Sequence, residues 1–171
     1  MWRLIILGRC HDCEDYTGID ISKTIIETNR KKRPKWFFIN SPAEEYVNGL
    51  KKECVFCFDL LFHIINEEAF TTILNNLCLY SSKFIFVNTW VSNPFSRHNQ
   101  VERFFYCLRS FKARSMLRAI KTAFFHPYTD GKYQYFRSLG TYMHIFMKHN
   151  FELIDQKTYE DNGLYIFRKM V

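Results

Sequence analysis

An aspartate closes the first segment of the chain that has clear strand character. Residues 15–21 read Asp-Tyr-Thr-Gly-Ile-Asp-Ile, and Asp20 stands just before the polar residues that begin at Ser22. In open parallel sheets, ligands bind beyond the carboxyl ends of the strands. A carboxylate there can accept hydrogen bonds from both hydroxyls of a ribose, and the small Gly18 lets a nucleoside approach the backbone. The alternative interpretation is that Asp20 only caps the helix that follows.

Two further side chains with acid–base chemistry lie in and after the apolar run at residues 55–62. Asp59 needs a hydrogen-bond partner if that run is buried, and a structural bond is expected more readily than contact with a ligand. His63 is the candidate for a general base, since it follows the run, although a packed and hydrogen-bonded histidine is the more common outcome.

The cysteines suggest a metal site that the sequence as a whole does not favour. Cys10-x-x-Cys13 and Cys54-x-x-Cys57 have the form of two zinc-ligand pairs. Cys57, however, falls inside a hydrophobic strand, where alternation directs it away from Cys54. Cysteines in a chain without an export signal are expected to be free thiols, and we expect no bound metal.

The composition is that of one packed domain with a preference for anionic partners. The 171 residues are 47% hydrophobic and include 18 Phe and 10 Tyr, which excludes a disordered chain. No apolar run approaches the roughly 18 residues that cross a bilayer, and the apolar opening is too short for a signal peptide. We therefore expect a cytoplasmic protein with no membrane partner. The net charge of +7 favours nucleic acid or a phosphorylated or carboxylated small molecule, unless it serves only solubility.

Strand-like and helix-like segments alternate along the first half of the chain, which predicts parallel strands joined by crossover helices. Ser41, Pro42 and Glu44 have the pattern of an N-cap, a first helical turn and a capping box. The elements expected after Asp20 are a helix over residues 22–32, a strand over 36–39 and a helix from 41 to about 52.

The second half continues the alternation and then interrupts it. A basic, aromatic insertion is expected at about residues 91–134, and an Asn162-Gly163 turn is the strongest hairpin signal. The elements expected here are strands over 55–62 and 83–88, helices over 67–80, 101–124 and 135–150, and terminal strands over 151–159 and 164–169.

Taken in order, these segments resemble the class I S-adenosylmethionine-dependent methyltransferases. Residues 16–22 look like the family's second-strand motif, and residues 39–44 fall where it has its adenine-contacting turn. Residues 58–65, 84–90 and 135–154 are similar to its fourth strand and loop, its fifth strand, and its last helix and sixth strand. The resemblance implies one α/β domain over residues 1–171. It would be a three-layer Rossmann-like sheet, mostly parallel, with a C-terminal antiparallel hairpin.

The resemblance also implies a cofactor and a reaction. S-adenosylmethionine would donate its methyl group by in-line displacement, with the protein chiefly holding donor and acceptor in line. Asp20 would bind the ribose, residues 40–43 the adenine side, and residues 58–63 the floor between cofactor and acceptor. The implied cofactor-binding set is Asp20, Ile21, Asn40, Ser41, Ala43 and Phe58.

The sequence departs from the family at its beginning. The family opens with a strand and a glycine-rich loop, but no G-x-G-x-G precedes Gly18. The residues between Gly8 and that motif are too few for a strand, loop and crossover helix. Residues 2–10 fit either a helix or a buried strand, and the simpler alignment makes them the first crossover helix of an N-terminally incomplete, truncated domain. The second and fourth strands would then have unpaired edges, or would meet directly.

The insertion has three interpretations. Its apolar residues form a stripe that can pack onto the domain, namely Phe104, Phe105, Leu108, Phe111, Leu117 and Ile120. Its basic residues are Arg97, Arg103, Arg109, Lys112, Arg114, Arg118 and Lys121. They can form a solvated face, a surface for a nucleic-acid strand, or a lid that binds an anionic small-molecule acceptor through Arg97 and Arg103 together with Tyr135.

Two functions therefore stand beside each other. The leading hypothesis is methyl transfer to an unidentified acceptor, impaired if the missing loop is essential. The alternative is a non-catalytic domain of the same fold that binds a partner or nucleic acid through its basic insertion. Whether the chain is an enzyme stays open at this point.

Overall fold

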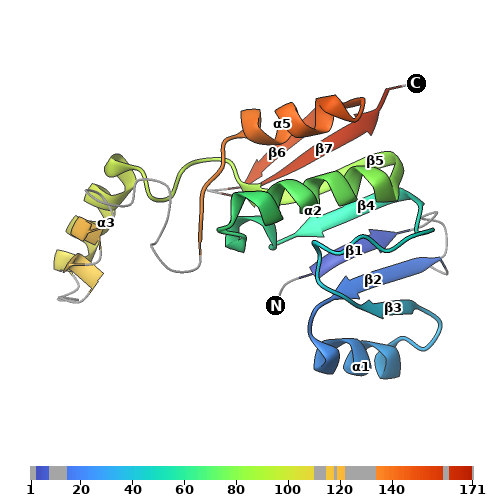
Figure 1. Ribbon diagram of the computed structural model, residues 1–171. Helices are drawn as coiled ribbons and strands as arrows, with labels where there is room; N and C mark the ends of the chain where they lie inside the picture. The colour runs from blue at the N-terminus through green and yellow to red at the C-terminus, as the bar shows by residue number, and fades with distance from the viewer. Residues whose placement is uncertain are drawn as a thin grey trace.

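The computed structural model describes residues 3–7, 15–109, 115–117, 119–121, 134–159 and 162–170, which build a mixed seven-stranded sheet. The strand order is β3-β2-β1-β4-β5-β7-β6 (Figure 1). Strands β2 to β6 run in one direction, while β1 and β7 run against their neighbours. The strands are β1 (Arg3–Leu7), β2 (Tyr16–Asp20), β3 (Phe37–Asn40), β4 (Lys52–Phe58), β5 (Ser81–Trp90), β6 (Phe151–Tyr159) and β7 (Asn162–Lys169).

Helices cover the two faces of the sheet and make three layers, as the sequence predicts (Figure 1). Helices α2 (Glu67–Tyr80) and α5 (Leu139–Lys148) lie on one face, and α1 (Lys23–Lys32) lies on the other beside β2 and β3. Strand alternation divides β2 between the two layers. Ile19 belongs to the core beneath α2 and α5, whereas Tyr16 packs with Ile26 of α1. None of the described helices has the length and hydrophobicity needed to cross a bilayer.

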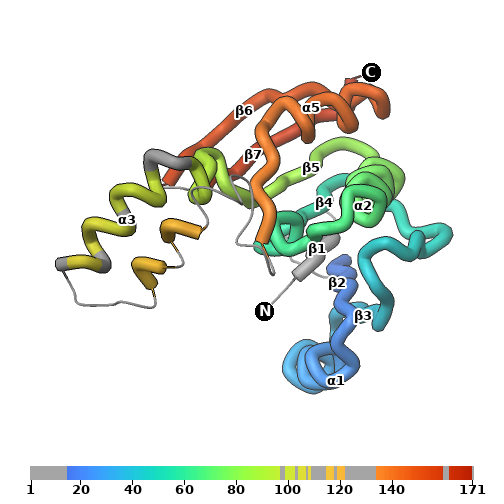
Figure 2. The backbone as a smooth tube through the Cα atoms, turned by 60° about the vertical axis from the view of Figure 1, so that its left-hand side comes forward, coloured from blue at the N-terminus to red at the C-terminus, as the bar shows by residue number. Residues whose placement is uncertain are grey.

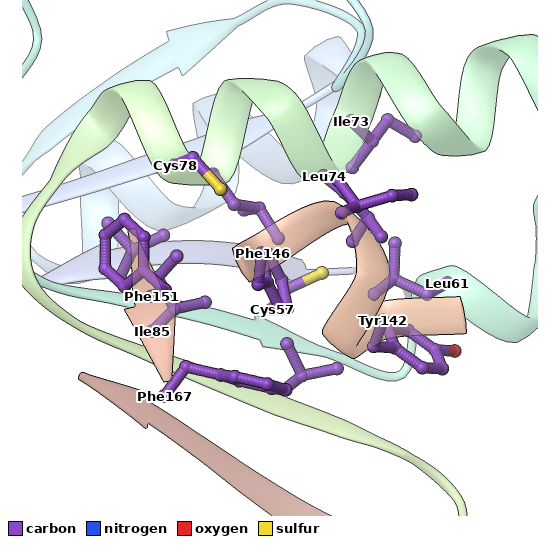
Figure 3. Close-up of a cluster of buried hydrophobic side chains, with 14 of the residues drawn as sticks. Cys57, Leu61, Ile73, Leu74, Cys78, Ile85, Tyr142, Phe146, Phe151 and Phe167 are labelled. Carbon is purple, nitrogen blue, oxygen red and sulfur yellow. The ribbon is translucent and has the colours of Figure 1, made fainter. Parts of the chain in front are cut away.

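The main core combines aromatic and aliphatic side chains from α2, α5 and the sheet (Figure 3). Phe70 and Leu74 of α2 and Phe146 of α5 are completely buried. They cover Cys57 of β4 and Ile85 of β5, which are buried to the same extent. This packing fixes α2 on β4 and β5, so the amino end of α2 stands at the carboxyl edge of the sheet.

Most of the remaining element predictions are confirmed. Ser22 caps α1, accepting from Ile25 N at 3.4 Å, as the 22–32 prediction requires. Residues 67–80 form α2, residues 81–90 contain the expected fifth strand, and α5 lies within the expected 135–150. The helix expected over 101–124 is observed as α3 (Arg97–Arg109) and further helical residues at 115–117 and 119–121.

Residues 3–7 form a strand, so the preferred interpretation of residues 2–10 as a crossover helix is wrong. Strand β1 occupies the centre of the sheet, with Ile5 opposite Gly18 of β2 and Phe56 of β4. It is antiparallel to both neighbours. A parallel crossover needs a dozen or more residues, whereas an antiparallel connection fits in the short stretch between Leu7 and Tyr16. The expected unpaired edges and the direct pairing of the second and fourth strands are therefore also wrong.

The helix expected from Ser41 to about residue 52 is absent, because side chains of α2 bind the backbone in its place. Ser41 Oγ lies 3.2 Å from the Glu45 carboxylate and forms no capping box with Glu44. The bonds to α2 run from Asn76 Nδ2 to the carbonyls of Ala43 (3.0 Å) and Glu44 (2.9 Å), from Val47 N to the Tyr80 hydroxyl (2.9 Å), and from that hydroxyl to the Glu45 carbonyl (3.2 Å).

The C-terminal hairpin is present, but its turn is not at Asn162-Gly163. Asn162 pairs with Tyr159 inside the ladder, so β7 begins there. A Cβ at position 163 would collide with Val91 Cγ1. Gly163 therefore permits the close approach of β7 to the end of β5, and it does not form the turn.

Burial raises the pKa of two cysteine thiols in the main core, so they stay protonated in the folded protein. Burial, with a smaller contribution from the Asp59 carboxylate, raises the pKa of the Cys57 thiol far above its usual value. Burial raises the pKa of Cys78 to about 12 despite the nearby Lys169. The folded pKa values exceed the unfolded ones, so this stabilisation is complete below the unfolded thiol pKa, about 8.5, and is lost as pH rises above it.

We predict that stability falls in alkali and that Cys57 accounts for part of the fall. Above the unfolded pKa, a thiol that stays protonated in the fold lowers the free energy of unfolding by about 1.4 kcal/mol per pH unit. Urea unfolding at pH 8 and pH 10 measures this. Cys57→Ala is less stable than the wild type at pH 8, and the gap narrows by about 1 kcal/mol or more at pH 10. An unchanged gap would contradict the assignment.

Candidate functional site

Asp20 ends β2 with one carboxylate oxygen bonded and the other without a partner. Oδ1 accepts a hydrogen bond from Ser22 N at 2.7 Å. Oδ2 is buried and has no hydrogen-bond partner in the part of the chain that the structure describes. Capping of the following helix therefore accounts for Oδ1 of Asp20 but not for the buried Oδ2. Leaving a buried acceptor unpaired costs about 1–3 kcal/mol, and such groups are typical of ligand sites.

Asn40 fixes the backbone that presents Asp20. Its Nδ2 donates to the carbonyls of Asp20 (3.0 Å) and Ile21 (2.8 Å), and Ser41 N donates to the Asp20 carbonyl at 3.2 Å. These bonds join the ends of β2 and β3. The amide nitrogen of Asn40 is thus engaged in positioning, and the Ser41 hydroxyl is engaged with Glu45.

Ile21 and Ala43 differ in what they offer a ligand. Ile21 follows Asp20 and is 68% exposed, which leaves an apolar surface beside the unpaired carboxylate oxygen. Ala43 is half-buried and packs against the main core. Of the two, Ile21 is the side chain that a flat apolar ring can cover.

Phe58 ends β4 on the same edge of the sheet. Only β1 separates β2 from β4, which places their ends roughly 10 Å apart. The backbone of Arg3, at the amino end of β1, pairs with Phe58. Asp59 follows with a left-handed φ of 53° and is exposed, so it lies outside the strand that was expected over residues 55–62 and needs no buried partner. An Asp tolerates this conformation better than most residues.

An aromatic cluster lines the turn after β4. His63 closes the 3₁₀ turn η1 (Leu61–His63), and its half-buried ring lies 4.4 Å from that of Phe62. Phe62 stacks on Trp90 at the end of β5, with a centroid distance of 4.6 Å, and Trp90 meets Phe95 edge-on. The predicted general base therefore lies beside a wall of rings at the carboxyl edge.

Arg137 holds this turn in place, and the sequence did not single it out. Its guanidinium, whose side chain is 3% exposed, pairs with Glu67 at 2.9 Å and donates to the carbonyls of Leu61 and Ile65, both at 3.5 Å. It lies 3.9 Å from the centroid of the Phe70 ring. A basic residue between an aromatic stretch and an apolar helix was the available signal, but its partners are distant in sequence.

The three substrate candidates are not brought together. Tyr135 donates its backbone N–H to the Phe62 carbonyl at 2.8 Å, and its ring lies 4.6 Å from the Arg137 guanidinium. It therefore adjoins the turn that carries His63. Arg97 and Arg103 belong to α3, which projects away from the sheet (Figures 1 and 2), and their side chains lie outside the described residues.

No metal centre is found in the part of the chain that the structure describes, where no three metal-ligating side chains cluster. Cys54 and Cys57 form no disulfide in that part of the chain. Cys10 and Cys13, the other half of the zinc hypothesis, lie outside the described residues.

The fold of the chain is similar to that of solved methyltransferase structures. The chain resembles magnesium protoporphyrin IX methyltransferase from Synechocystis PCC 6803 with bound SAM, at 13% identity and a TM-score of 0.56, covering 90% of this chain and 59% of that one. For N-methyltransferase NodS from Bradyrhizobium japonicum in complex with S-adenosyl-L-homocysteine, identity is 11%, the TM-score 0.57, and coverage 94% and 69%. For a SAM-dependent methyltransferase from Methanosarcina mazei, the values are 12%, 0.61, and 91% and 82%.

These likenesses show the fold. No protein-family model matches the sequence, and no curated protein matches it closely enough to count as a relative. The chain spans 59% of the length of the Synechocystis enzyme. It has the α/β Rossmann-like fold of class I S-adenosylmethionine-dependent methyltransferases, as the resemblance implied.

We predict that Arg137 stabilises the fold far more than an exposed arginine in an equally close ion pair. Arg137→Met leaves the Leu61 and Ile65 carbonyls without their donor and lowers the free energy of unfolding by about 2–4 kcal/mol. Arg168, paired with Glu152 at 2.6 Å and 53% exposed, is the matched control. Arg168→Met costs less than about 1 kcal/mol, as exposed pairs do. Equal losses in urea unfolding would contradict the anchoring role.

Proposed function

We propose that this protein transfers a methyl group from S-adenosylmethionine to a small-molecule acceptor. The observation that carries the proposal is the buried, unpaired Oδ2 of Asp20 at the carboxyl edge of β2. A ribose hydroxyl would supply the donor that this oxygen lacks. The similar folds crystallised with SAM or S-adenosyl-L-homocysteine support the same cofactor class.

The described residues divide the work of holding the cofactor. Asp20 would accept from the ribose, and Ile21 would cover one face of the adenine. Asn40 and Ser41 would act through the backbone of residues 20 and 21, which they bind, while Ala43 would support the adenine side from the core. S-adenosylmethionine, when bound, supplies an electrophilic methyl group on a sulfonium.

The acceptor would lie towards the ends of β4 and β5. Phe58 and the Phe62–Trp90 wall would exclude water from it, and His63 would take its proton. Arg137 would position this wall through η1. Tyr135, whose backbone N–H binds the Phe62 carbonyl, would contact the acceptor, whereas the predicted contacts Arg97 and Arg103 lie on α3, which projects away from this part of the sheet.

One rival function stands beside methyl transfer. Because β1 is antiparallel to β2 and β4, its carboxyl end lies at the edge opposite Asp20. A domain that keeps the fold without catalysing methyl transfer, and binds a partner instead, is consistent with this geometry. Cofactor binding distinguishes the two.

We predict that titration calorimetry detects binding of S-adenosylmethionine and of S-adenosyl-L-homocysteine, and that Asp20→Asn weakens both roughly ten- to a hundredfold, the value of a charged hydrogen bond. The asparagine keeps an acceptor for Ser22 N and removes an unpaired buried charge. Its unfolding free energy should therefore match the wild type within about 1 kcal/mol or exceed it.

The matched control is Asp155→Asn, the same change at an exposed position on β6. It leaves both affinities unchanged. No binding heat at millimolar ligand would end the methyltransferase proposal for this chain. A destabilised Asp20→Asn with normal affinity would make Asp20 purely structural.

A further inference from the structure

The net charge of the chain is concentrated in one segment. Residues 97–121 contain the seven basic residues named above and a single acidic residue, Glu102, which leaves +6 of the chain's total of +7. The described part of this segment comprises α3 and the helical residues 115–117 and 119–121, called here the α3 arm. The remainder of the molecule is close to neutral.

The α3 arm stands clear of the sheet (Figures 1 and 2). Its base is fixed, because Phe95 is buried against Trp90 and Gln100 Nε2 donates to the Pro94 carbonyl at 2.7 Å. Beyond this base, α3 extends away from α2 and α5. The apolar stripe of the insertion, which could have packed onto the domain, leaves Phe105, Leu108, Leu117 and Ile120 exposed.

Large apolar side chains on the arm face water. Val101, Phe105 and Leu108 are spaced i, i+4 and i+7, which places them on one face of α3, and Phe105 is 55% exposed. Leu117 and Ile120 form a second exposed pair, and Leu117 is 69% exposed. Exposed apolar residues grouped in this way mark an interaction surface.

The arm's chemistry selects among possible partners. A second copy of residues 97–121 would carry the same net charge of +6 and be repelled. A nucleic-acid strand would use the exposed rings of Phe105 and Tyr106 for stacking, but it would leave the exposed aliphatic side chains Val101, Leu108, Leu117 and Ile120 unused. An anionic lipid surface uses both features, since apolar side chains enter the interface while basic residues bind the headgroups.

We propose that the α3 arm docks this protein onto membranes that contain anionic lipid. Contact is peripheral and reversible. It does not depend on methyl transfer, and it differs from the expectation, drawn from the sequence, that the protein has no membrane partner. That expectation considered only helices that span a bilayer, whereas the arm presents its apolar residues at the surface.

Vesicle co-sedimentation of the intact chain tests the proposal. The wild type binds vesicles of phosphatidylcholine mixed with phosphatidylglycerol, does not bind pure phosphatidylcholine, and dissociates as salt is raised. Phe105→Glu combined with Leu117→Glu lowers the affinity at least about tenfold, because it removes two inserting side chains and adds repelling charge.

The matched control is Phe37→Glu combined with Ile154→Glu, which makes a similar change at two exposed positions on β3 and β6. Both double variants add two negative charges, so both change the long-range attraction to the vesicle equally. Because the control removes no inserting side chain, it binds within about twofold of the wild type. Circular dichroism checks whether the double variant keeps its helix content. If it does not, Leu117→Glu alone is the variant to be compared with the wild type. Binding that ignores phosphatidylglycerol, an equal loss in the control, or binding to an oligonucleotide but not to vesicles would overturn the proposal.

Discussion

The backbone pairing of β1 with two strands at once is the constraint on which the rest of the structure depends. Strands β2 and β4 both need a partner on their inner edges, because buried backbone groups without hydrogen bonds are costly. The short connection to β2 permits only an antiparallel strand there. One reversed strand therefore completes the sheet. It also brings the carboxyl ends of β2 and β4 to the two sides of its own amino end.

At the carboxyl edge of the sheet, one end carries a buried group without a hydrogen-bond partner, and at the other end the polar groups are hydrogen-bonded. At the end of β2, Asp20 keeps one oxygen buried and unpaired while Asn40 holds the backbone behind it. At the ends of β4 and β5, Arg137 is bonded to Glu67 and to two carbonyls, and it holds the aromatic turn firmly. In the proposed function, the unpaired carboxylate oxygen would bind the ribose of the cofactor, and the aromatic residues held by Arg137 would line the place of the methyl acceptor.

Local patterns predicted much of the fold, and long-range contacts decided the rest. The segments around α1, α2, β5 and β6 carry periodicity and caps that their tertiary contacts reinforce, and the position of Asp20 at the end of a strand was predicted correctly. The Ser41 capping box failed because Asn76 and Tyr80, distant in sequence, bind the same backbone. The direction of β1 depends on which strands flank it, and Arg137 on partners far along the chain. Neither the direction of β1 nor the partners of Arg137 can be recognised from the residues next to them in the sequence.

Cross-strand nuclear Overhauser effects in β1 test the central claim most directly. The antiparallel register predicts backbone contacts from Leu4 to both Ile19 and Cys57, and from Ile6 to both Thr17 and Val55. Observation of all four would establish a reversed strand between β2 and β4. Contacts in a parallel register, or direct contacts between β2 and β4, would contradict the account, because the carboxyl edge would then be built differently around Asp20.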